Sequence, residues 1–405
     1  MTKNNANHKI MGPTNNGIDF SNTQVAFSNK SDKELKKAAW LFSIMNKQWL
    51  VDSMSSLGLT AIKMRLPFVN TIVKNTIFDQ FVGGRTLLES QPAISRLYDS
   101  NVQSILDYGA EAKTTEKDFN FTMNENMRAI EFAVTNESVP VISTKITGLA
   151  RFELLENIQK GEPLTKETRS EYRNVLKRLD ALCHLAYEKK VGIFFDAEES
   201  WIQDAIDHLV RLMMKRYNQK SVIIYNTYQL YRWDRLQILM DSFSLAQNEN
   251  YMLGAKLVRG AYMEKERERA TEMGYPSPIH SNKQETDDAY NTALKFCLDN
   301  YQQIGMCNAT HNQESVLLMA NVIQQRSIPK QHPHLNFCQL YGMSDHLTFN
   351  LANSGYNVAK YLPYGKIKEV IPYLIRRAKE NTAVSGDMSR EYSFIKKELE
   401  RRKRG

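Results

Sequence analysis

The fold is decided by the stretch Gly192-Ile193-Phe194-Phe195-Asp196-Ala197-Glu198-Glu199. Its apolar half is typical of a parallel strand buried on both faces, and its polar half brings three carboxylates directly after that strand. A buried charge without a partner is unfavourable, so we expect a basic partner for these acids, with Lys145 or an arginine as the simplest choice. The same order, apolar first and polar last, recurs along the chain.

Short β-rich segments alternate with amphipathic helical segments after residue 98. The helices show apolar residues at helical spacing, as in Val175, Leu179 and Leu182. The predicted strands are 103–107, 139–146, 192–196, 222–225, 254–258, 305–309, 335–340 and 357–361. Parallel strands need helical crossovers, and eight of them can close around a packed interior, so the sequence predicts an α/β fold of the (β/α)8 TIM-type barrel class. An open doubly wound sheet is the structural alternative.

The polar residues at the strand ends favour the barrel over the open sheet. They are Asp107 and Glu111; Lys145; Asp196, Glu198 and Glu199; Asn226, Tyr228 and Gln229; Arg259 and Tyr262; Thr310 and His311; Tyr341; and Tyr361. In a barrel these ends converge on one rim, which is where the active sites of this fold lie.

Four ranges describe the organisation of the chain. Residues 1–29 are polar and aperiodic, and we expect them to be a disordered tail. Residues 30–98 form a predicted helical N-terminal segment that opens with the capping-box spacing of Ser31 and Glu34. Residues 99–390 form the barrel, and residues 391–405 form a basic C-terminal helix or tail.

Composition limits the class of protein. The chain has 405 residues and a formal net charge of +8, and it lacks the interleaved basic and aromatic pattern that would indicate nucleic-acid binding. No apolar run reaches the roughly 20 residues of a membrane-spanning helix, and no secretory or mitochondrial leader is evident, so we expect a cytoplasmic protein. Four scattered cysteines, each in an apolar segment, are predicted to be buried thiols: Cys183, Cys297, Cys307 and Cys338.

A late helical segment carries the strongest signal for a binding site. Helical spacing places Tyr373, Arg376, Arg377 and Glu380 on a single face. Two neighbouring guanidinium groups beside an aromatic ring can grip a carboxylate through bidentate hydrogen bonds. A solvated basic face is the alternative interpretation of the same pattern.

Other strand ends carry residues whose chemistry stays open. Lys145 could bind an anion, form a Schiff base or extend into water. Lys256 and Arg259 lie in an otherwise apolar strand segment, and an inward-pointing Lys256 would need an anionic or electron-rich ligand. A lone His311 is more often structural than a base. His332 and other histidines lack metal-ligand spacing, so no metal site is predicted, and no G-x-G-x-x-G follows a strand.

Four short motifs in the same order resemble the proline dehydrogenase family. They are Tyr373-x-x-Arg376-Arg377-x-x-Glu380-Asn381, Lys256-Leu257-Val258-Arg259-Gly260-Ala261-Tyr262, Phe195-Asp196-Ala197-Glu198 and Thr310-His311-Asn312. The likeness spans about residues 100–390. It implies a distorted (β/α)8 barrel that holds FAD without a dinucleotide-binding fold and oxidises L-proline to 1-pyrroline-5-carboxylate, the first step of proline catabolism.

The resemblance also implies roles for individual residues. Arg376 and Arg377 would bind the substrate carboxylate, and Glu111 would pair with Arg376 to close the site. Asp196 and Lys256 match catalytic positions. The remaining substrate-side residues would be Lys145, Tyr262, Leu340, Tyr361 and Tyr373. The flavin side would be formed by Asn226, Gln229, Lys256, Val258, Arg259, Gly260, Ser281, Lys283, Thr310 and His311.

One position departs from many bacterial relatives, which carry arginine where this chain has Lys256; lysine there resembles the eukaryotic-like branch. The implied chemistry is hydride transfer from the ring carbon C5 to flavin N5, for which the protein supplies position and electrostatics.

Three alternatives remain at this point. A hydroxyproline dehydrogenase is closely related, but Tyr361 stands where relatives that prefer hydroxyproline tend to have smaller residues. A Schiff-base lysine enzyme would use Lys145 or Lys256 without a flavin, and a non-catalytic binding module would keep only the anion clamp.

The resemblance further implies partners. Electrons would pass to a quinone, and a separate pyrroline-5-carboxylate dehydrogenase would consume the product of what we expect to be a monofunctional enzyme. The basic residues of 391–405 raise the hypothesis of peripheral contact with the inner face of the membrane.

Overall fold

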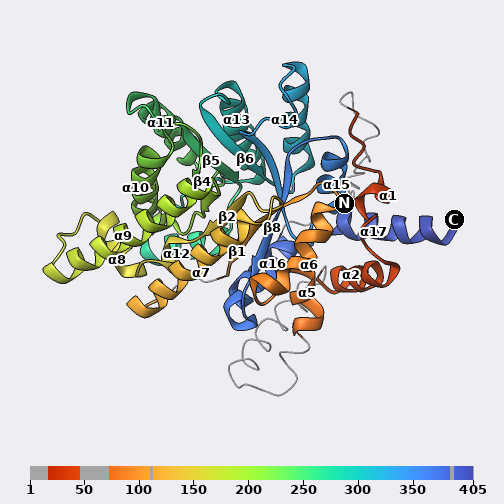
Figure 1. The fold of residues 1–405 in the computed structure, drawn as a ribbon, viewed down its shortest axis with the longest axis horizontal. Helices are drawn as coiled ribbons and strands as arrows, with labels where there is room; N and C mark the ends of the chain where they lie inside the picture. The colour runs from red at the N-terminus through yellow and green to blue at the C-terminus, as the bar shows by residue number, and fades with distance from the viewer. Residues whose placement is uncertain (1–16, 46–72, 110–112, 384–386, 405) are drawn as a thin grey trace.

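Eight parallel strands close into a barrel in chain order, with β1 paired to β8 (Figure 1). The architecture comes from a computed structural model that describes residues 17–45, 73–109, 113–383 and 387–404, with the backbone alone for 378–383 and 387–389. The strands are β1 (Gln103–Tyr108), β2 (Val141–Thr144), β3 (Gly192–Phe195), β4 (Ile224–Gln229), β5 (Leu253–Val258), β6 (Ile304–Ala309), β7 (Leu335–Leu340) and β8 (Val358–Tyr364). The predicted (β/α)8 barrel is confirmed, and the open sheet is wrong.

Two strands extend further than the sequence predicted. β4 runs to Gln229 and β8 to Tyr364, so Asn226 and Gln229 lie within β4 and not beyond it, and Tyr361 lies in the middle of β8 and not at its end. These polar side chains can lie within strands because each of them makes a hydrogen bond there. For example, Gln229 Nε2 donates to the carbonyl of Glu198 at 2.7 Å.

The barrel interior is filled by alternate residues of the strands. Their cluster contains Ile105, Phe194, Tyr225, Cys307, Cys338, Ala359 and Tyr361. Side chains alternate along a strand, so the residue two positions further faces the same way. By that rule Asp107 follows Ile105, and Asp196 follows Phe194, toward the carboxyl end of the barrel. All four cysteines are buried free thiols, as predicted.

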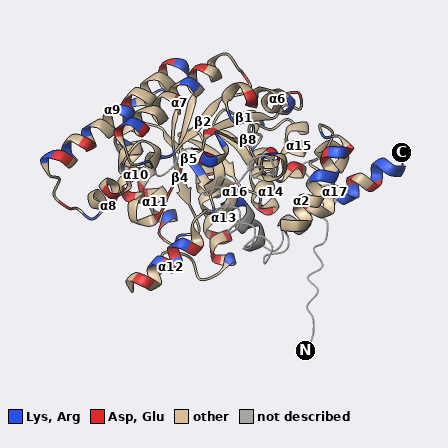
Figure 2. Cartoon of the chain, turned by 90° about the horizontal axis from the view of Figure 1, so that it is seen from below, with Lys and Arg blue, Asp and Glu red and all other residues tan. Residues whose placement is uncertain are grey.

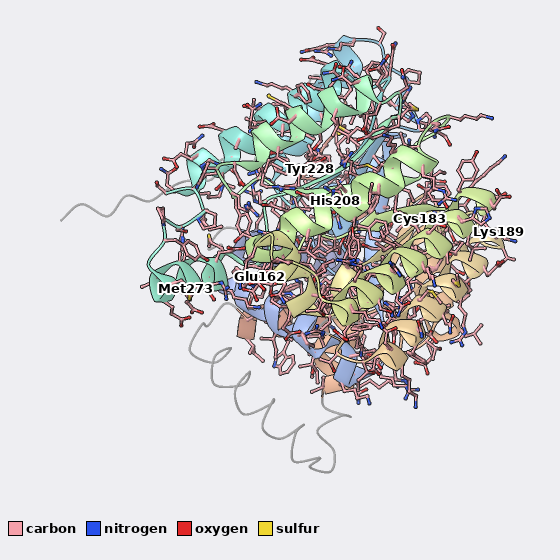
Figure 3. All side chains as sticks on the ribbon, turned by 90° about the vertical axis from the view of Figure 1, so that its left-hand side faces the viewer. Glu162, Cys183, Lys189, His208, Tyr228 and Met273 are labelled. Atoms are coloured by element: carbon pink, nitrogen blue, oxygen red, sulfur yellow. The ribbon has the colours of Figure 1, made fainter. Side chains whose placement is uncertain are left out.

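Helices surround the barrel and cover its outer faces. They are α1 (Thr23–Ala26), α2 (Asp32–Met45), α5 (Asp79–Phe81), α6 (Leu87–Tyr98), α7 (Glu116–Val134), α8 (Phe152–Gln159), α9 (Lys166–Lys189), α10 (Ser200–Tyr217), α11 (Arg235–Asn248), α12 (Met263–Met273), α13 (Lys283–Asp299), α14 (Gln313–Gln325), α15 (Asp345–Asn353), α16 (Ile367–Ala383) and α17 (Asp387–Arg404), with a π-helical turn η1 (Lys74–Phe78) and a 3-10 turn η2 (Ile146–Gly148). Figure 3 shows α9, with Cys183, beside α10, with His208; α10 in turn packs on β4, the strand of Tyr228.

The N-terminal region differs in part from the prediction. The capping box is confirmed, because the backbone N–H of Ser31 donates to Glu34 Oε2 at 2.8 Å and Glu34 N–H donates back to Ser31 Oγ at 3.3 Å. The disordered tail is wrong for residues 17–29, which include α1. Ile18 and Phe27 are fully buried there, since scattered apolar residues too sparse to show a period still have a surface to pack on. Residues 1–16 lie outside the described part of the chain.

The flanking helices gather at one side of the barrel. α1, α2 and α17 lie together there (Figure 1), and Figure 2 shows the basic residues concentrated along α17. One hydrophobic cluster joins Phe42 of α2, Phe81 of α5, Tyr373 of α16 and Ile395 of α17. The flanking segments are therefore held against the helix that carries the arginine pair. In the described residues, no helix combines the length and apolarity needed to cross a membrane.

Candidate active site at the carboxyl rim of the barrel

Asp196 is the centre of a hydrogen-bonded group inside the barrel mouth. Its Oδ1 accepts from Lys256 Nζ at 2.6 Å and from Ser143 Oγ at 2.8 Å. Its Oδ2 accepts from Tyr361 Oη at 2.6 Å. The three donors come from β5, β2 and β8, so the barrel itself fixes the carboxylate from three sides.

Lys256 is held as a buried ammonium ion. Its Nζ lies 4.6 Å from the ring centre of Tyr361 and 5.5 Å from that of Phe194. Burial alone would lower the pKa of Lys256, but the Asp196 carboxylate beside it raises the pKa above the ordinary value. The pKa of Asp196 is correspondingly lowered, because the Lys256 charge and the hydrogen bonds from Lys256 and Tyr361 outweigh the effect of burial. Both groups are therefore charged at neutral pH.

Asp107 lies near this pair, but its pKa is shifted in the opposite direction from that of Asp196. Burial, followed by the neighbouring Asp196 charge, raises the pKa of Asp107 to about 7, although Lys145, Tyr361 and Lys256 oppose the shift. The barrel mouth thus holds one ionised carboxylate and one carboxyl group that titrates near neutrality. Pairs of acids pushed apart in this way are typical of active sites.

Two cationic side chains contact Tyr262 at the rim of the barrel. Lys145 follows β2 and its Nζ lies 3.4 Å from Tyr262 Oη. The Arg376 guanidinium lies 5.6 Å from the ring centre of the same tyrosine, and the buried Arg377 lies 5.3 Å from that of Tyr373. Lys145 and Arg376 therefore approach one region of the rim, and Arg377 lies near enough to His311 that, besides burial, its charge lowers the pKa of that ring.

The predicted partner of the acids after β3 was wrong in detail. Lys256 and not Lys145 pairs with Asp196, and Lys265 pairs with Glu199. Glu198 instead accepts the backbone N–H of Thr147 at 3.0 Å. Lys256 on β5 reaches Asp196 after β3, past the intervening strand β4. Spacing along the chain cannot reveal this pairing.

A second polar strip follows β5 and β6. Arg259 donates to Asp287 at 2.7 Å, to Thr310 Oγ1 at 2.7 Å and to Ser315 Oγ at 3.1 Å. Gly260 has a φ of +143°, and a Cβ there would come within 2.4 Å of the Tyr231 ring, so only glycine fits.

His311 lies next to this strip and is neutral. Burial, and then the charges of Lys360, Arg377 and Arg259, lower the pKa of His311 to about 3. Its Nδ1 lies 2.8 Å from Ser344 Oγ. A neutral ring in this position can both donate and accept a hydrogen bond.

The structure does not bring every predicted residue to the rim. Asn226 points to the helix layer, where its Nδ2 donates to Asp207 of α10 at 2.8 Å. Ser281 and Lys283 are exposed at the start of α13, and Lys283 pairs with Asp287. Glu111 and the side chain of Glu380 lie outside the described residues.

Other members of the site carried weaker signals. Asp107 was visible only as one polar strand end among several. Ser143, two positions before Lys145, faces the same way along β2 and could have been found from that alternation. In the described residues, no group of three or more histidine, cysteine or acidic side chains could hold a metal ion.

Leu340 is placed as predicted. It packs against the interior cluster that contains Tyr361 and also against the cluster that contains Tyr373. It therefore lies between the inner wall of the barrel and α16, the helix of the arginine pair.

Fold and site together define an α/β-barrel enzyme with a cationic rim and a buried pair of acids. A family model described as "Proline dehydrogenase" matches residues 90–390. The chain therefore belongs to the proline dehydrogenase family, and it is an oxidoreductase that acts on the CH–NH group of proline.

Individual relatives agree with this assignment. The chain is 32% identical to proline dehydrogenase 1, mitochondrial, of Dictyostelium discoideum, over 96% of this chain and 76% of the relative. It is 30% identical to a hydroxyproline dehydrogenase of Xenopus laevis, over 95% of this chain and 90% of the relative. Among solved structures, proline utilization A (PutA) of Bdellovibrio bacteriovorus matches with a TM-score of 0.69 and 22% identity, over 88% of this chain and 38% of the PutA chain, and so supports the fold.

Proposed function

We propose that the protein uses FAD to oxidise L-proline to 1-pyrroline-5-carboxylate and passes the electrons to a quinone. The observation that carries the proposal is the approach of Lys145 and Arg376 to Tyr262 at the mouth of a barrel whose interior holds the Asp196–Lys256 pair. Arg377, the neighbour of Arg376, is buried beside Tyr373. The cations suit the carboxylate of a small amino acid. The buried pair beneath them suits a rigid, water-poor pocket for its ring.

The chemistry of the donor set on the β4–β6 side fits FAD. Lys256 and Arg259 are cations, and Gln229, Thr310 and neutral His311 are uncharged donors, a mixture that suits the polar edge of an isoalloxazine ring and a diphosphate. Lys256, Gln229, Arg259, Thr310 and His311 would hold the cofactor, which when bound supplies the hydride-accepting ring. Asn226 and Gln229 each already donate one amide hydrogen, to Asp207 and to the Glu198 carbonyl, and the Asn226 bond turns its amide toward the helix layer.

The protein's own residues would position and neutralise the substrate. Arg376, Arg377 and Lys145 would fix the carboxylate, and that anchor would set where C5 of the ring lies. Tyr361 would pack against the ring, because its hydroxyl is held by Asp196 and its side chain is only 6% exposed.

A flavin spectrum tests the proposal directly. The purified protein should carry bound FAD that bleaches when L-proline is added without oxygen, and the imine product should react with o-aminobenzaldehyde. A protein that stays colourless after reconstitution with FAD, or whose flavin is unaffected by proline, would contradict the assignment.

Selectivity for proline over hydroxyproline is part of the proposal, since the family includes hydroxyproline dehydrogenases. The Tyr361→Ala variant removes a ring from the barrel interior and should lower the ratio of kcat/KM for L-proline to that for trans-4-hydroxy-L-proline by about tenfold, the order expected for one or two kcal/mol of lost fit. Steady-state assays of both substrates measure it. An unchanged ratio would show that Tyr361 does not set the preference.

The Schiff-base alternative has less support. A lysine nucleophile must lose its proton, whereas Lys256 is held charged by Asp196 at 2.6 Å. Borohydride reduction in the presence of substrate, followed by mass spectrometry, distinguishes the two reactions. Only a Schiff-base enzyme would gain the mass of the substrate on a lysine.

Electron transfer to a quinone and contact with a membrane belong to the same proposal. The basic C-terminal helix is only partly available for such contact, because Arg401 and Arg402 both pair with Glu398. Lys396, Lys403 and Arg404 remain exposed and could face anionic lipid. If replacing these three with glutamine left liposome binding and quinone-dependent activity unchanged, the membrane role would be discarded. In the same proposal, the imine product passes to a separate pyrroline-5-carboxylate dehydrogenase.

A further inference from the structure

The two carboxyl groups in the barrel mouth differ in what surrounds their oxygens. Asp196 accepts three hydrogen bonds, from Lys256, Ser143 and Tyr361, so both of its oxygens are already engaged. Asp107 takes part in none of the ion pairs within 4.0 Å among the described residues. Asp107 is nevertheless buried on the inner face of β1, where only 6% of its surface is exposed.

The position of Asp107 follows from the register of the strands. Ile105 lies opposite Tyr361 of β8, and Asp107 lies opposite Ser143 of β2. On the other side, Asp107 lies opposite Pro363 of β8, two residues nearer the carboxyl end of the barrel than Tyr361. Lys145 follows β2, the strand next to Asp107, at the same end of the barrel.

Tyr361 connects the two acids and constrains their protons. Its hydroxyl has a single hydrogen, which it donates to Asp196 Oδ2 at 2.6 Å. In this arrangement Tyr361 does not also donate to Asp107, although it lies near enough that a hydrogen bond from its hydroxyl would lower the pKa of Asp107. The charged and titratable groups that face Asp107 are Asp196 on the β3 side, Lys145 after β2, Lys256 on β5 and Tyr361 on β8.

Oxidation of proline needs a proton acceptor. The secondary amine of free proline is an ammonium ion at neutral pH, and its nitrogen lone pair must be free to form the C=N bond as hydride leaves C5. The arginine pair and Lys145 suit the carboxylate end of the substrate. The ammonium end requires an acid with an oxygen still available, and Asp107 meets that requirement.

We propose that Asp107 is the catalytic base that accepts the ammonium proton of bound L-proline. In this step one N–H bond breaks, its electron pair stays on nitrogen, and an O–H bond forms on the Asp107 carboxylate. The neighbouring Lys145 and Lys256 disfavour a positive charge on the substrate, while burial and the Asp196 charge favour the protonated form of Asp107. This inference rests on the proposed function, since it assigns a step of that reaction.

The experiment compares the wild-type holoenzyme with Asp107→Asn, which keeps the shape of the side chain but cannot take a proton. With proline and an artificial dye acceptor, kcat/KM of the wild type should rise with pH through about 7, where Asp107 ionises. The variant should lose that rise. Its kcat should fall about 100-fold, the lower end of the usual effect of a general base, while KM for proline should stay within about threefold.

Ser104→Ala is the matched control. Ser104 is fully buried on the same strand, but three residues away and on the opposite face. It should keep the wild-type pH profile, which separates the loss of a base from general disturbance of β1.

A second readout does not depend on turnover. A carboxyl group that retains its proton in the folded state makes the protein lose thermal stability as pH rises from about 4 to about 7. Asp107→Asn should weaken that loss, and the folded yield of this variant shows whether it can be compared at all with the wild type.

The outcomes separate the two claims. If the wild type oxidises proline and Asp107→Asn retains the rise near pH 7, Asp107 is not the base and the inference is overturned while the proposed function stands. If the wild type fails to oxidise proline under any condition, both are overturned. A variant that loses the rise and shows a weaker pH-dependent loss of stability than the wild type supports the inference.

Discussion

At the scale of single residues, the site depends on the burial of charges that are compensated within the barrel. Asp196 and Lys256 come from strands 60 positions apart in sequence and meet at 2.6 Å. A buried ion pair contributes little net stability, but breaking it leaves an uncompensated charge. The pair therefore fixes the geometry of the barrel mouth more than it stabilises the fold.

The first prediction concerns the stability of this pair. Asp196→Ala should lower the free energy of unfolding by about 3–5 kcal/mol, because Lys256 is left buried without its counterion. The double variant Asp196→Ala/Lys256→Met should recover much of that loss, since no charge remains. Urea unfolding measures both. Equal destabilisation of the single and double variants would show that packing and not charge is responsible.

The second prediction concerns Glu198, whose burial raises its pKa to about 7. The unfolded pKa is near 4.3, so the folded state retains more protons between about pH 4 and 7, and the stability contribution of Glu198 is present at low pH and lost as pH rises. Glu198→Gln cannot ionise and should flatten this decline. Thermal unfolding at half-unit pH steps measures it. A slope identical to that of the wild type would mean that Glu198 ionises normally.

At the scale of elements, α16 carries two neighbouring arginines whose side chains point to different partners. Arg376 and Arg377 are adjacent in sequence, yet they stack on different tyrosines, Tyr262 and Tyr373. The helix itself is held by the hydrophobic cluster that includes Leu374 and Phe81. Its orientation therefore depends on segments outside the barrel.

The third prediction tests the clamp on α16. Arg377→Lys keeps the charge but loses the planar fork, so KM for proline should rise about 10- to 100-fold, as expected for the loss of 1.5–3 kcal/mol from hydrogen bonds to a carboxylate. Arg169→Lys, at an exposed position of α9, is the control. An unchanged KM in steady-state assays would refute the clamp.

At the scale of the whole molecule, both flanking segments converge on the turn between β7 and α15. Asp345, the first residue of α15, pairs with Lys30 at 2.7 Å and with Lys360 of β8 at 2.8 Å. The carboxylate of Glu391 on α17 accepts from the backbone N–H of Ser344 at 3.1 Å. The N-terminal and C-terminal segments thus contact the loop that follows Leu340 at the end of β7.

The fourth prediction compares a buried and an exposed ion pair of the N-terminal segment. Lys30→Met removes one of the two cations beside Asp345, which is 3% exposed, and should raise KM for proline and lower stability by about 1–3 kcal/mol. Lys37→Met, whose exposed pair with Asp79 spans 3.1 Å, should change stability by less than about 1 kcal/mol. Equal effects of the two substitutions would remove the N-terminal segment from any supporting role.

The sequence by itself determined the barrel and most of the rim. Strand-length apolar runs that end in polar residues, as in 192–199, repeat because parallel strands must be buried on both faces while their carboxyl ends meet at one edge. That periodicity is local, so it can be read without coordinates. The helix that carries Arg376 and Arg377 was likewise predictable from the spacing of its own residues.

Tertiary structure decided which charges meet. Lys256 pairs with Asp196, Asn226 turns toward Asp207, and Lys30 reaches Asp345, each across a sequence separation that no local pattern encodes. The ordering of residues 17–29 was decided in the same way, since Ile18 and Phe27 pack only once the barrel and α17 provide a surface. Pairings of this kind depend on strand register and closure, and these are properties of the folded whole.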